Sequence, residues 1–263
     1  MITGENRFRA LVLTGDGINC EQETAQALKQ AKFQPKVRHL NDLIAEKLSL
    51  DDLSTQYSVL ALPGGFSFGD DLTSGKVLAL KIQHKLGWNL GTYASRGGLV
   101  IGICNGFQAL IRMGVFGSDV SITHNIQGKF VNSWVKVTPS GTRCVWLKGL
   151  GTVDLPIRHG EGRIIIDTGR RTETLEKMDR QGMTCLKYET AVTGSPNGSE
   201  ENLAGLCDPT GRIFGLMPHP ESFIRWTSHP EWTTQPARAS APGQGLTLFE
   251  NAYQEVARGS VTS

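Results

Sequence analysis

The sequence lacks the features that mark several classes of protein. It has 5 cysteines in 263 residues and no C-x-x-C pair, and its net charge is only +2. Scattered cysteines argue against a disulfide framework or a zinc site and favour a reducing compartment. This small net charge gives no reason to expect nucleic acid or a membrane surface as a partner. The first residues carry charges where a signal peptide needs an apolar core, and no apolar run reaches the roughly 18 residues of a membrane span. We therefore expect a cytoplasmic protein.

Two nucleotide-binding motifs are also missing. The chain contains neither G-x-x-x-x-G-K-[ST] nor G-x-G-x-x-G, so its glycine-rich turns do not predict a phosphate cradle. No cluster of histidine, cysteine and carboxylate residues has metal-ligand spacing. We expect no ATP site, no metal and no other cofactor in this chain.

Glycine, by contrast, is abundant: 31 of 263 residues, about 12% against an average of about 7%. Tight turns between strands and helices explain such an excess. Apolar strand-like runs alternate with amphipathic helical ones in the first half of the chain, at 9–13, 21–32, 35–40, 58–62, 74–86 and 99–103. This alternation predicts an α/β protein with a doubly wound, mostly parallel sheet, whose ligand site lies at the carboxyl ends of the strands.

The second half favours additional strands, which we expect to be antiparallel. Candidate runs are 130–137, 144–147, 163–167, 186–188 and 212–217. A closing helix is expected at 245–258, after an irregular loop at 226–244. No repeat or linker is visible, so we expect one domain over 1–263, with a core at about 9–224 and a carboxyl-terminal loop and helix at 225–258.

One stretch of the sequence contains a candidate catalytic nucleophile. The buried strand expected at 99–103 runs through Gly102-x-Cys104-x-Gly106 into a helical pattern, which is the nucleophile-elbow arrangement with cysteine in place of serine. The flanking glycines let strand and helix approach closely, and the helix amino terminus favours a thiolate. An isolated strand-end cysteine is usually a small buried hydrophobe, but this setting makes Cys104 the candidate nucleophile.

A thiolate nucleophile needs a base and an orienting group. His219 and Glu221 follow an apolar strand in Met-Pro-His-Pro-Glu; in an extended chain they would project from the same side, with Glu221 fixing the imidazole tautomer. His159 and Glu161 compete for this role, but glycines surround them and no strand clearly leads in, so we interpret them as a loop over the pocket. The other histidines, at 39, 84, 124 and 229, are expected at the surface.

An attacked carbonyl also needs donors for its developing negative charge. The backbone N–H of Asn105, directly after the nucleophile, is one candidate. The second is expected from the turn after the neighbouring strand, where Gly64 and Gly65 offer unshielded N–H groups.

These motifs resemble those of class I (triad) glutamine amidotransferases. PGG, GICNGFQ and PHPE occur in the order of that family, and DGINCEQET, PGGFSFGDDL, HGEG and PNGS resemble the branch that forms the glutaminase part of phosphoribosylformylglycinamidine synthase. The resemblance covers about residues 9–224 and the last helix. It implies a flavodoxin-like fold, Cys104, His219 and Glu221 as catalytic triad, and an oxyanion hole of Gly65 and Asn105. It also implies that Gln108 holds the substrate and that His159 and Glu161 line its pocket.

The function implied by the resemblance is hydrolysis of L-glutamine to glutamate and ammonia. The ammonia would pass to a synthetase subunit that uses ATP and Mg²⁺ during purine synthesis, with a small bridging subunit as a further partner. The family's usual arginines are replaced by Ser133 and Ser222. The open alternatives are the glutaminase of another synthetase, a free cysteine hydrolase and a catalytically silent regulatory subunit.

Overall fold

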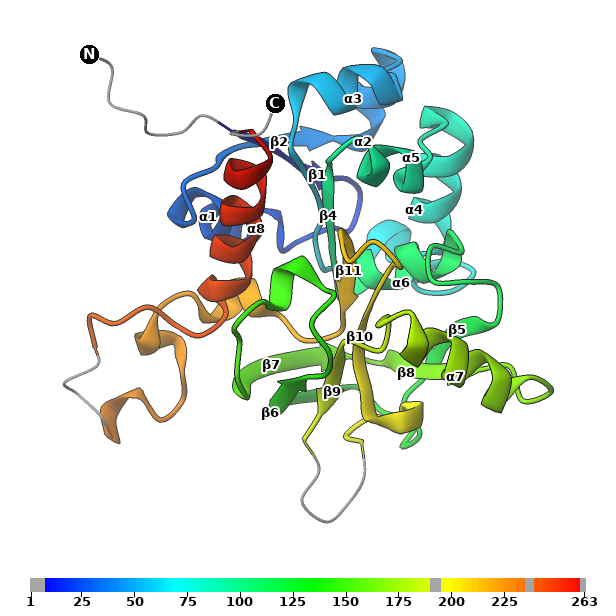
Figure 1. Cartoon of the computed structure of the whole chain (residues 1–263), viewed down its shortest axis with the longest axis vertical. Helices are drawn as coiled ribbons and strands as arrows, with labels where there is room; N and C mark the ends of the chain where they lie inside the picture. The colour runs from blue at the N-terminus through cyan, green and yellow to red at the C-terminus, as the bar shows by residue number, and fades with distance from the viewer. Residues whose placement is uncertain (1–7, 190–194, 235–238, 261–263) are drawn as a thin grey trace.

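The computed structural model describes residues 8–189, 195–234 and 239–260. Within them, nine strands form one sheet in the order β2-β1-β3-β4-β11-β10-β9-β6-β7, and β5 and β8 form a separate antiparallel pair. The large sheet has two halves (Figure 1). Strands β2 to β11 in that order pair in parallel, and β11 to β7 pair antiparallel.

The parallel half is the doubly wound unit predicted from the sequence. Its order 2-1-3-4 followed by a fifth strand is the flavodoxin-like order. Every residue of β3, β4 and β11 is buried, as expected for parallel strands covered on both faces. The strands are β1 (Arg9–Thr14), β2 (Gln34–His39), β3 (Val59–Leu62), β4 (Leu99–Ile103) and β11 (Ile213–Leu216).

Helices cover both faces of this half. In Figure 1, α1 and α8 lie together on one side of the strands, and α4, α5 and α6 lie on the other. The helix after β3 continues α4 by one wider turn at Ile82–Leu86, and α5 follows before β4. The helices are α1 (Glu21–Gln30), α2 (Leu40–Ala45), α3 (Leu50–Gln56), α4 (Lys76–Lys81), α5 (Leu90–Ser95), α6 (Asn105–Arg112), α7 (Arg171–Arg180) and α8 (Leu246–Gly259).

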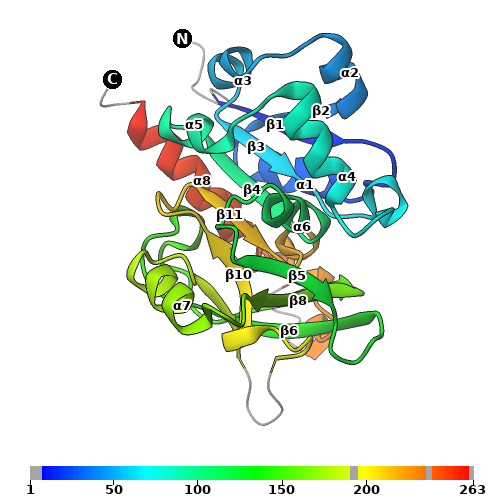
Figure 2. The same ribbon diagram turned by 90° about the vertical axis from the view of Figure 1, so that its right-hand side faces the viewer.

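The antiparallel half extends below the parallel half, with the β5–β8 pair beside it (Figure 2). Three strands of this region, β5, β7 and β10, were not among the candidate runs, and the run at 144–147 is a short 3₁₀ turn, η3, instead of a strand. The strands are β5 (Val120–His124), β6 (Val131–Pro139), β7 (Val153–His159), β8 (Glu161–Ile166), β9 (Leu186–Tyr188) and β10 (Leu203–Cys207).

Short 3₁₀ turns supply most of the remaining structure. Two of them lie in the segment before α8 that was expected to be irregular. The turns are η1 (Ser67–Asp70), η3 (Val145–Leu147), η4 (Glu200–Asn202), η5 (Pro220–Phe223), η6 (Trp226–Ser228) and η7 (Trp232–Thr234). Among the residues described, no helix is both long enough and apolar enough to cross a bilayer.

Candidate active site

The predicted elbow is present between β4 and α6. Cys104 has φ 50° and ψ −105° and directly precedes the helix, a strained conformation typical of a nucleophile elbow. Its N–H donates to the carbonyl of Leu216 at 2.8 Å. The two glycines are required by close packing: a Cβ on Gly106 would lie 1.9 Å from the carbonyl oxygen of Leu62, and one on Gly102 would lie 2.8 Å from that of Gly106.

The Cys104 side chain is buried and has a defined partner. Its Sγ donates to the backbone carbonyl of Arg158 at 3.6 Å. Arg158 lies in β7, in the antiparallel half of the sheet. The thiol therefore lies between the parallel strand that carries it and a segment more than 50 residues away in the sequence.

His219 and Glu221 meet as predicted, but through a different backbone. Nδ1 of His219 lies 2.7 Å from Oε1 of Glu221, and both side chains are buried. The segment is not extended: Pro220 begins the 3₁₀ turn η5, directly after His219, because a proline has the right φ for a helical first position. The N–H of His219 donates to the carbonyl of Pro156 in β7 at 2.8 Å.

The carboxylate and two thiols set the electrostatics of His219. Burial alone lowers the pKa of the imidazole, but the charge of Glu221 and the thiols of Cys104 and Cys20 outweigh it, and the pKa lies well above the ordinary value. Since Nδ1 faces the carboxylate, Nε2 is the nitrogen left for chemistry. It is buried, and no hydrogen-bond partner for it occurs among the described residues.

Cys20 is a neighbour of the site that sequence reasoning did not select. Burial raises the pKa of its thiol, an effect that the neighbouring His219 partly offsets, and its Sγ donates to Oδ1 of Asn19 at 3.3 Å. A Cβ on Gly64 would lie 2.8 Å from Cε1 of His219 and 3.4 Å from Sγ of Cys20, so both side chains pack against the bare backbone of Gly64. The sequence did contain a signal for this neighbour: Cys20 follows the first strand and so lies at the same sheet edge as Cys104.

The turn at Gly64 and Gly65 is held in one orientation. The carbonyl of Gly64 accepts hydrogen bonds from the N–H groups of Asn19 at 3.3 Å and Cys20 at 3.2 Å. The peptide therefore turns the N–H of Gly65 to the opposite side, where it has no partner within the described residues. Gly65 has φ 145°, and a Cβ there would lie 2.7 Å from the carbonyl oxygen of Gly17. Only glycine fits this turn.

A pocket of about 180 Å³ opens at Cys104. Its lining includes four of the predicted site residues besides the cysteine, together with an arginine, a histidine and two aromatic residues from other segments. The lining residues are Gly65, Phe66, Asp70, Ser74, Cys104, Gln108, His124, Phe130, Arg158, His159, Gly160 and Glu161. Sequence reasoning missed the contributions of Arg158, Asp70 and His124.

Asn105 and Gln108 form a buried amide network at one wall. Nδ2 of Asn105 donates to Oε1 of Gln108 at 2.9 Å and to Oδ1 of Asp70 at 3.0 Å, and Oδ1 of Asn105 accepts from the N–H of Ser67 at 3.0 Å. Nε2 of Gln108 donates to the carbonyl of Glu161. The two amides thus connect the start of α6 to the loop after β3 and to β8.

His159 and Glu161 do line the pocket, but they do not form a loop. His159 ends β7 and Glu161 begins β8, so the expectation that no strand leads into them was wrong. The ring of His159 packs over Gly162, where a Cβ would lie 2.3 Å away. Gly160 and Gly162 lie where the chain crosses from β7 in the large sheet to β8 in the β5–β8 pair.

His159 is neutral. Burial, and secondly the charge of His219, lower its pKa to about 4. Its Nδ1 lies 3.0 Å from Oδ1 of Asn125, an oxygen that also accepts from the N–H of Gly162, so Nδ1 carries the proton and donates. Nε2 is a buried acceptor that has no partner within the described part of the chain.

Among the described residues, two groups place possible metal-ligand atoms close together. Cys20, His219 and Glu221 have ligand atoms within 4.8 Å of one another, but His219 and Glu221 already bind each other. Cys144, Cys185 and Cys207 form the second group. All five cysteines are free. The cysteines are scattered in the sequence, but the fold brings three distant ones together near strands of the antiparallel half.

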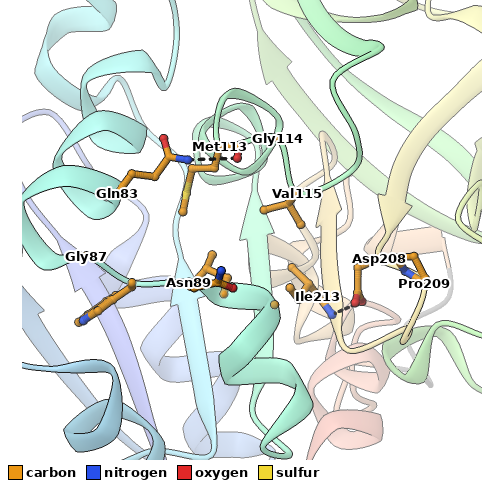
Figure 3. A pocket seen from close by; sticks show the side chains of 12 residues that line it. Gln83, Gly87, Asn89, Met113, Gly114, Val115, Asp208, Pro209 and Ile213 are labelled. Carbon is orange, nitrogen blue, oxygen red and sulfur yellow. Dashed lines mark hydrogen bonds between the residues drawn. The ribbon is translucent and has the colours of Figure 1, made fainter.

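A larger pocket, of about 560 Å³, lies at the other edge of the sheet (Figure 3). It is bordered by Ile213 at the start of β11, the segment before α5 and the end of α6. The polar groups at its wall bind within the protein: Nε2 of Gln83 donates to the carbonyl of Met113 at 3.1 Å, and Asp208 accepts from the N–H of Ile213 at 2.8 Å.

Comparison with known proteins agrees with this geometry. The family model of the CobB/CobQ-like glutamine amidotransferase domain matches residues 7–255. The chain is 36% identical to phosphoribosylformylglycinamidine synthase subunit PurQ of Dehalococcoides mccartyi, over 95% of this chain and 98% of the relative. It is also 36% identical to the PurQ subunit of Methanococcus maripaludis, over 94% of this chain and 96% of that one.

A solved structure gives the same result. The fold matches a chain in the structure of PurLQS from Thermotoga maritima with a TM-score of 0.70 and 30% identity, over 95% of this chain and 98% of that chain. The chain therefore belongs to the glutamine amidotransferase family and, within it, to the PurQ subunits of phosphoribosylformylglycinamidine synthase.

Proposed function

We propose that this chain hydrolyses L-glutamine to glutamate and ammonia and supplies the ammonia to a synthetase subunit that makes phosphoribosylformylglycinamidine in purine biosynthesis. The observation that carries the proposal is the strained Cys104 at the elbow, beside a buried His219–Glu221 pair. The family assignment supports the overall reaction, and the geometry supports the roles of individual residues.

The first half of the reaction forms a thioester. A proton leaves the Cys104 thiol for Nε2 of His219, whose raised pKa favours the imidazolium. The thiolate attacks the side-chain carbonyl carbon of glutamine and forms the carbon–sulfur bond. His219 then returns the proton to the amide nitrogen, the carbon–nitrogen bond breaks, and ammonia leaves.

The second half releases glutamate. Neutral His219 takes a proton from water, and the resulting hydroxide attacks the thioester carbonyl. The carbon–sulfur bond breaks, which regenerates the Cys104 thiolate beside the protonated imidazole. Glu221 does not contact the substrate. Its Oε1 lies 2.7 Å from Nδ1 of His219 and accepts the proton of that nitrogen, which stabilises the imidazolium in both halves of the reaction.

The N–H groups of Gly65 and Asn105 are the proposed oxyanion hole. The Gly65 N–H is without a partner in the described chain and is fixed by the two hydrogen bonds to the Gly64 carbonyl. Asn105 is the first residue of α6, where backbone N–H groups lack partners within the helix. Donors that are oriented before the reaction stabilise the tetrahedral intermediate most effectively.

The charged pocket residues suit a free amino acid substrate. Arg158 lines the pocket, so we assign its guanidinium to the substrate carboxylate. Arg158 pairs with Asn132 across β6 and β7, whereas Ser133, at the position of the family's usual arginine, pairs with Ile157 and therefore faces the other side of the sheet. The carboxylate of Glu161 and the acceptor Nε2 of His159 are assigned to the substrate ammonium group.

The partner subunits are inferred from relatives. The Thermotoga maritima structure is named for three components, PurL, PurQ and PurS together. By analogy, this chain assembles with a synthetase subunit and a small bridging subunit. ATP and Mg²⁺ belong to the synthetase, since this sequence has no phosphate-binding motif.

The test is a pair of rates measured on the complex with its synthetase. Cys104→Ala should abolish glutamine-dependent product formation, whereas formation from added ammonium chloride should remain at the wild-type rate. Equal loss of both rates would contradict the division of labour. A wild-type chain that hydrolyses glutamine but gives no phosphoribosylformylglycinamidine with this synthetase would indicate the glutaminase of a different enzyme.

A further inference from the structure

We infer that the three cysteines outside the active site form a binding site for one thiophilic metal ion with a filled d shell, such as Cu⁺ or Zn²⁺. Cys144, Cys185 and Cys207 come from segments separated by 41 and 22 residues of sequence, yet their sulfur atoms lie within 4.8 Å of one another. A trigonal metal centre with bonds of about 2.3 Å holds its sulfurs about 4 Å apart. The thiols are therefore close to ligand geometry.

The fold brings the three residues together through regular structure. Cys207 ends β10, Cys185 directly precedes the neighbouring β9, and the N–H groups of both donate to the carbonyl of Met183 at 2.9 Å. Cys144 precedes η3, and the next N–H donates to the carbonyl of Gly211 at 3.0 Å. The sulfurs are held by packed strands and turns, as a preformed metal site requires.

Burial and hydrogen bonding describe the surroundings of this cluster. The three residues are 3%, 2% and 0% exposed. Sγ of Cys207 donates to the carbonyl of Gly182 at 3.3 Å, and Sγ of Cys185 to that of Gly205 at 4.0 Å. The three thiols would release their protons to solvent when a cation binds.

The donor set selects the class of ion. Thiolates favour Cu⁺ and Zn²⁺ over hard cations. The nearby carboxylate of Asp208 is already used: it accepts from Thr210, Arg212 and Ile213. Three sulfurs alone suit Cu⁺, whereas Zn²⁺ would need a water or a backbone carbonyl as fourth ligand.

The site is separate from catalysis. Cys207 pairs with Phe214 near the start of β11. The N–H of Cys104 instead donates a hydrogen bond to the carbonyl of Leu216, the last residue of β11. The cluster therefore lies at the opposite edge of the sheet. A separate pocket of about 290 Å³ is lined by Met183, whose carbonyl accepts from the N–H groups of Cys185 and Cys207.

The experiment uses the full chain with Cys20→Ser and Cys104→Ser, which leaves only the three clustered thiols. We expect it to retain one equivalent of Cu⁺ against bicinchoninate, or one of Zn²⁺ against a pyridylazo dye, with a near-ultraviolet sulfur-to-metal absorption for Cu⁺. Adding Cys185→Ser should weaken binding by at least about 10-fold, because a ligand is lost. Retention of Cu⁺ alone indicates three-coordination, and retention of Zn²⁺ indicates a fourth ligand.

Two controls keep the result interpretable. Circular dichroism and thermal unfolding show whether the serine variants fold. If Cys185→Ser does not fold, Cys144→Ser removes a different proposed ligand and serves as the test variant. The metal should also raise the unfolding temperature of the three-thiol protein and leave that of the Cys185→Ser variant unchanged. Failure to retain either ion, or equal retention after loss of a clustered cysteine, would overturn the inference.

Discussion

The two edges of the parallel sheet differ in how their polar groups are used. At the carboxyl edge, a pocket of about 180 Å³ borders Cys104, and Nε2 of His159, Nε2 of His219 and Oε2 of Glu221 are buried without partners in the described chain. At the amino edge, a pocket of about 560 Å³ borders Asp208, whose carboxylate accepts from the N–H groups of Thr210 and Ile213.

We propose that unused hydrogen-bonding capacity, more than the volume of a pocket, marks the active site. Burying a polar group without a partner costs free energy, so such groups persist where a substrate will satisfy them. At the amino edge, the side chains of Gln83 and Asp208 are hydrogen-bonded within the protein. Changes at the carboxyl edge should therefore alter activity and pH dependence, and changes at the amino edge should alter stability alone.

The largest effect is expected at the triad. His219→Ala should lower kcat for glutamine hydrolysis by about 10²–10⁴-fold, the usual contribution of a general acid–base. Glu221→Gln should lower kcat by a smaller factor, since the amide oxygen of the new side chain still accepts the Nδ1 proton of His219. Glutamate release from glutamine measures both. If Glu221→Gln has wild-type turnover, the base pair is His159 and Glu161 instead.

A smaller loss is expected from Gly64→Ala. The new Cβ would lie 2.8 Å from Cε1 of His219, and displacing a catalytic ring by about 1 Å costs roughly 10²-fold in rate. The matched control is Gly151→Ala, where nothing lies within 4 Å of the new Cβ. Equal kcat values for the two variants would mean that Gly64 does not position the imidazole.

The next effect concerns stability in acid. His159 has a pKa of about 4 when folded against 6.5 as the ordinary value, so the unfolded chain binds more protons between these values and stability falls as the pH drops through this window. Linkage gives a loss of about 2 kcal/mol at pH 5 relative to pH 7 from this residue alone.

Replacing the titrating ring should remove that loss. His159→Gln should narrow the difference in unfolding free energy between pH 7 and pH 5, measured by urea titration. His219, whose raised pKa has the opposite effect, is present in both proteins and cancels. An unchanged pH dependence would show that His159 does not remain neutral in the folded chain.

The smallest effect is expected at the amino edge. Asn89 lines the larger pocket (Figure 3) and caps α5 by accepting from the N–H of Thr92 at 2.9 Å. Asn89→Ala should cost about 1 kcal/mol of stability, the usual value for a lost cap, and leave kcat and KM for glutamine unchanged. A change in KM would make this pocket part of the active site.

The carboxyl edge was the more predictable part of the molecule. Its signals are local: the run at 99–103 followed by Gly102-x-Cys104-x-Gly106 specifies a strand, a turn and a helix within a few residues. The meeting of His219 and Glu221 was also predicted, although Pro220 produces it through a 3₁₀ turn and not through extended backbone.

The antiparallel half was less predictable because its contacts are distant in sequence. Pro156 in β7 hid a strand, although proline is tolerated at a sheet edge, and the strand that carries Arg158 and His159 was therefore missed. The convergence of three cysteines depends on the pairing of β9 with β10, which no local pattern reveals. His229, expected at the surface, is buried and stacks on Trp226 at 5.3 Å.

The most direct test distinguishes the two thiols that lie beside His219. A diazo-ketone analogue of L-glutamine alkylates the nucleophile of a glutaminase and stays attached, so digestion and mass spectrometry identify the labelled residue. We predict one adduct per chain, on Cys104, formed more slowly when glutamine is present and still formed in Cys20→Ser. An adduct on Cys20, or complete loss of labelling in Cys20→Ser with Cys104 intact, would contradict the assignment of Cys104 as the nucleophile.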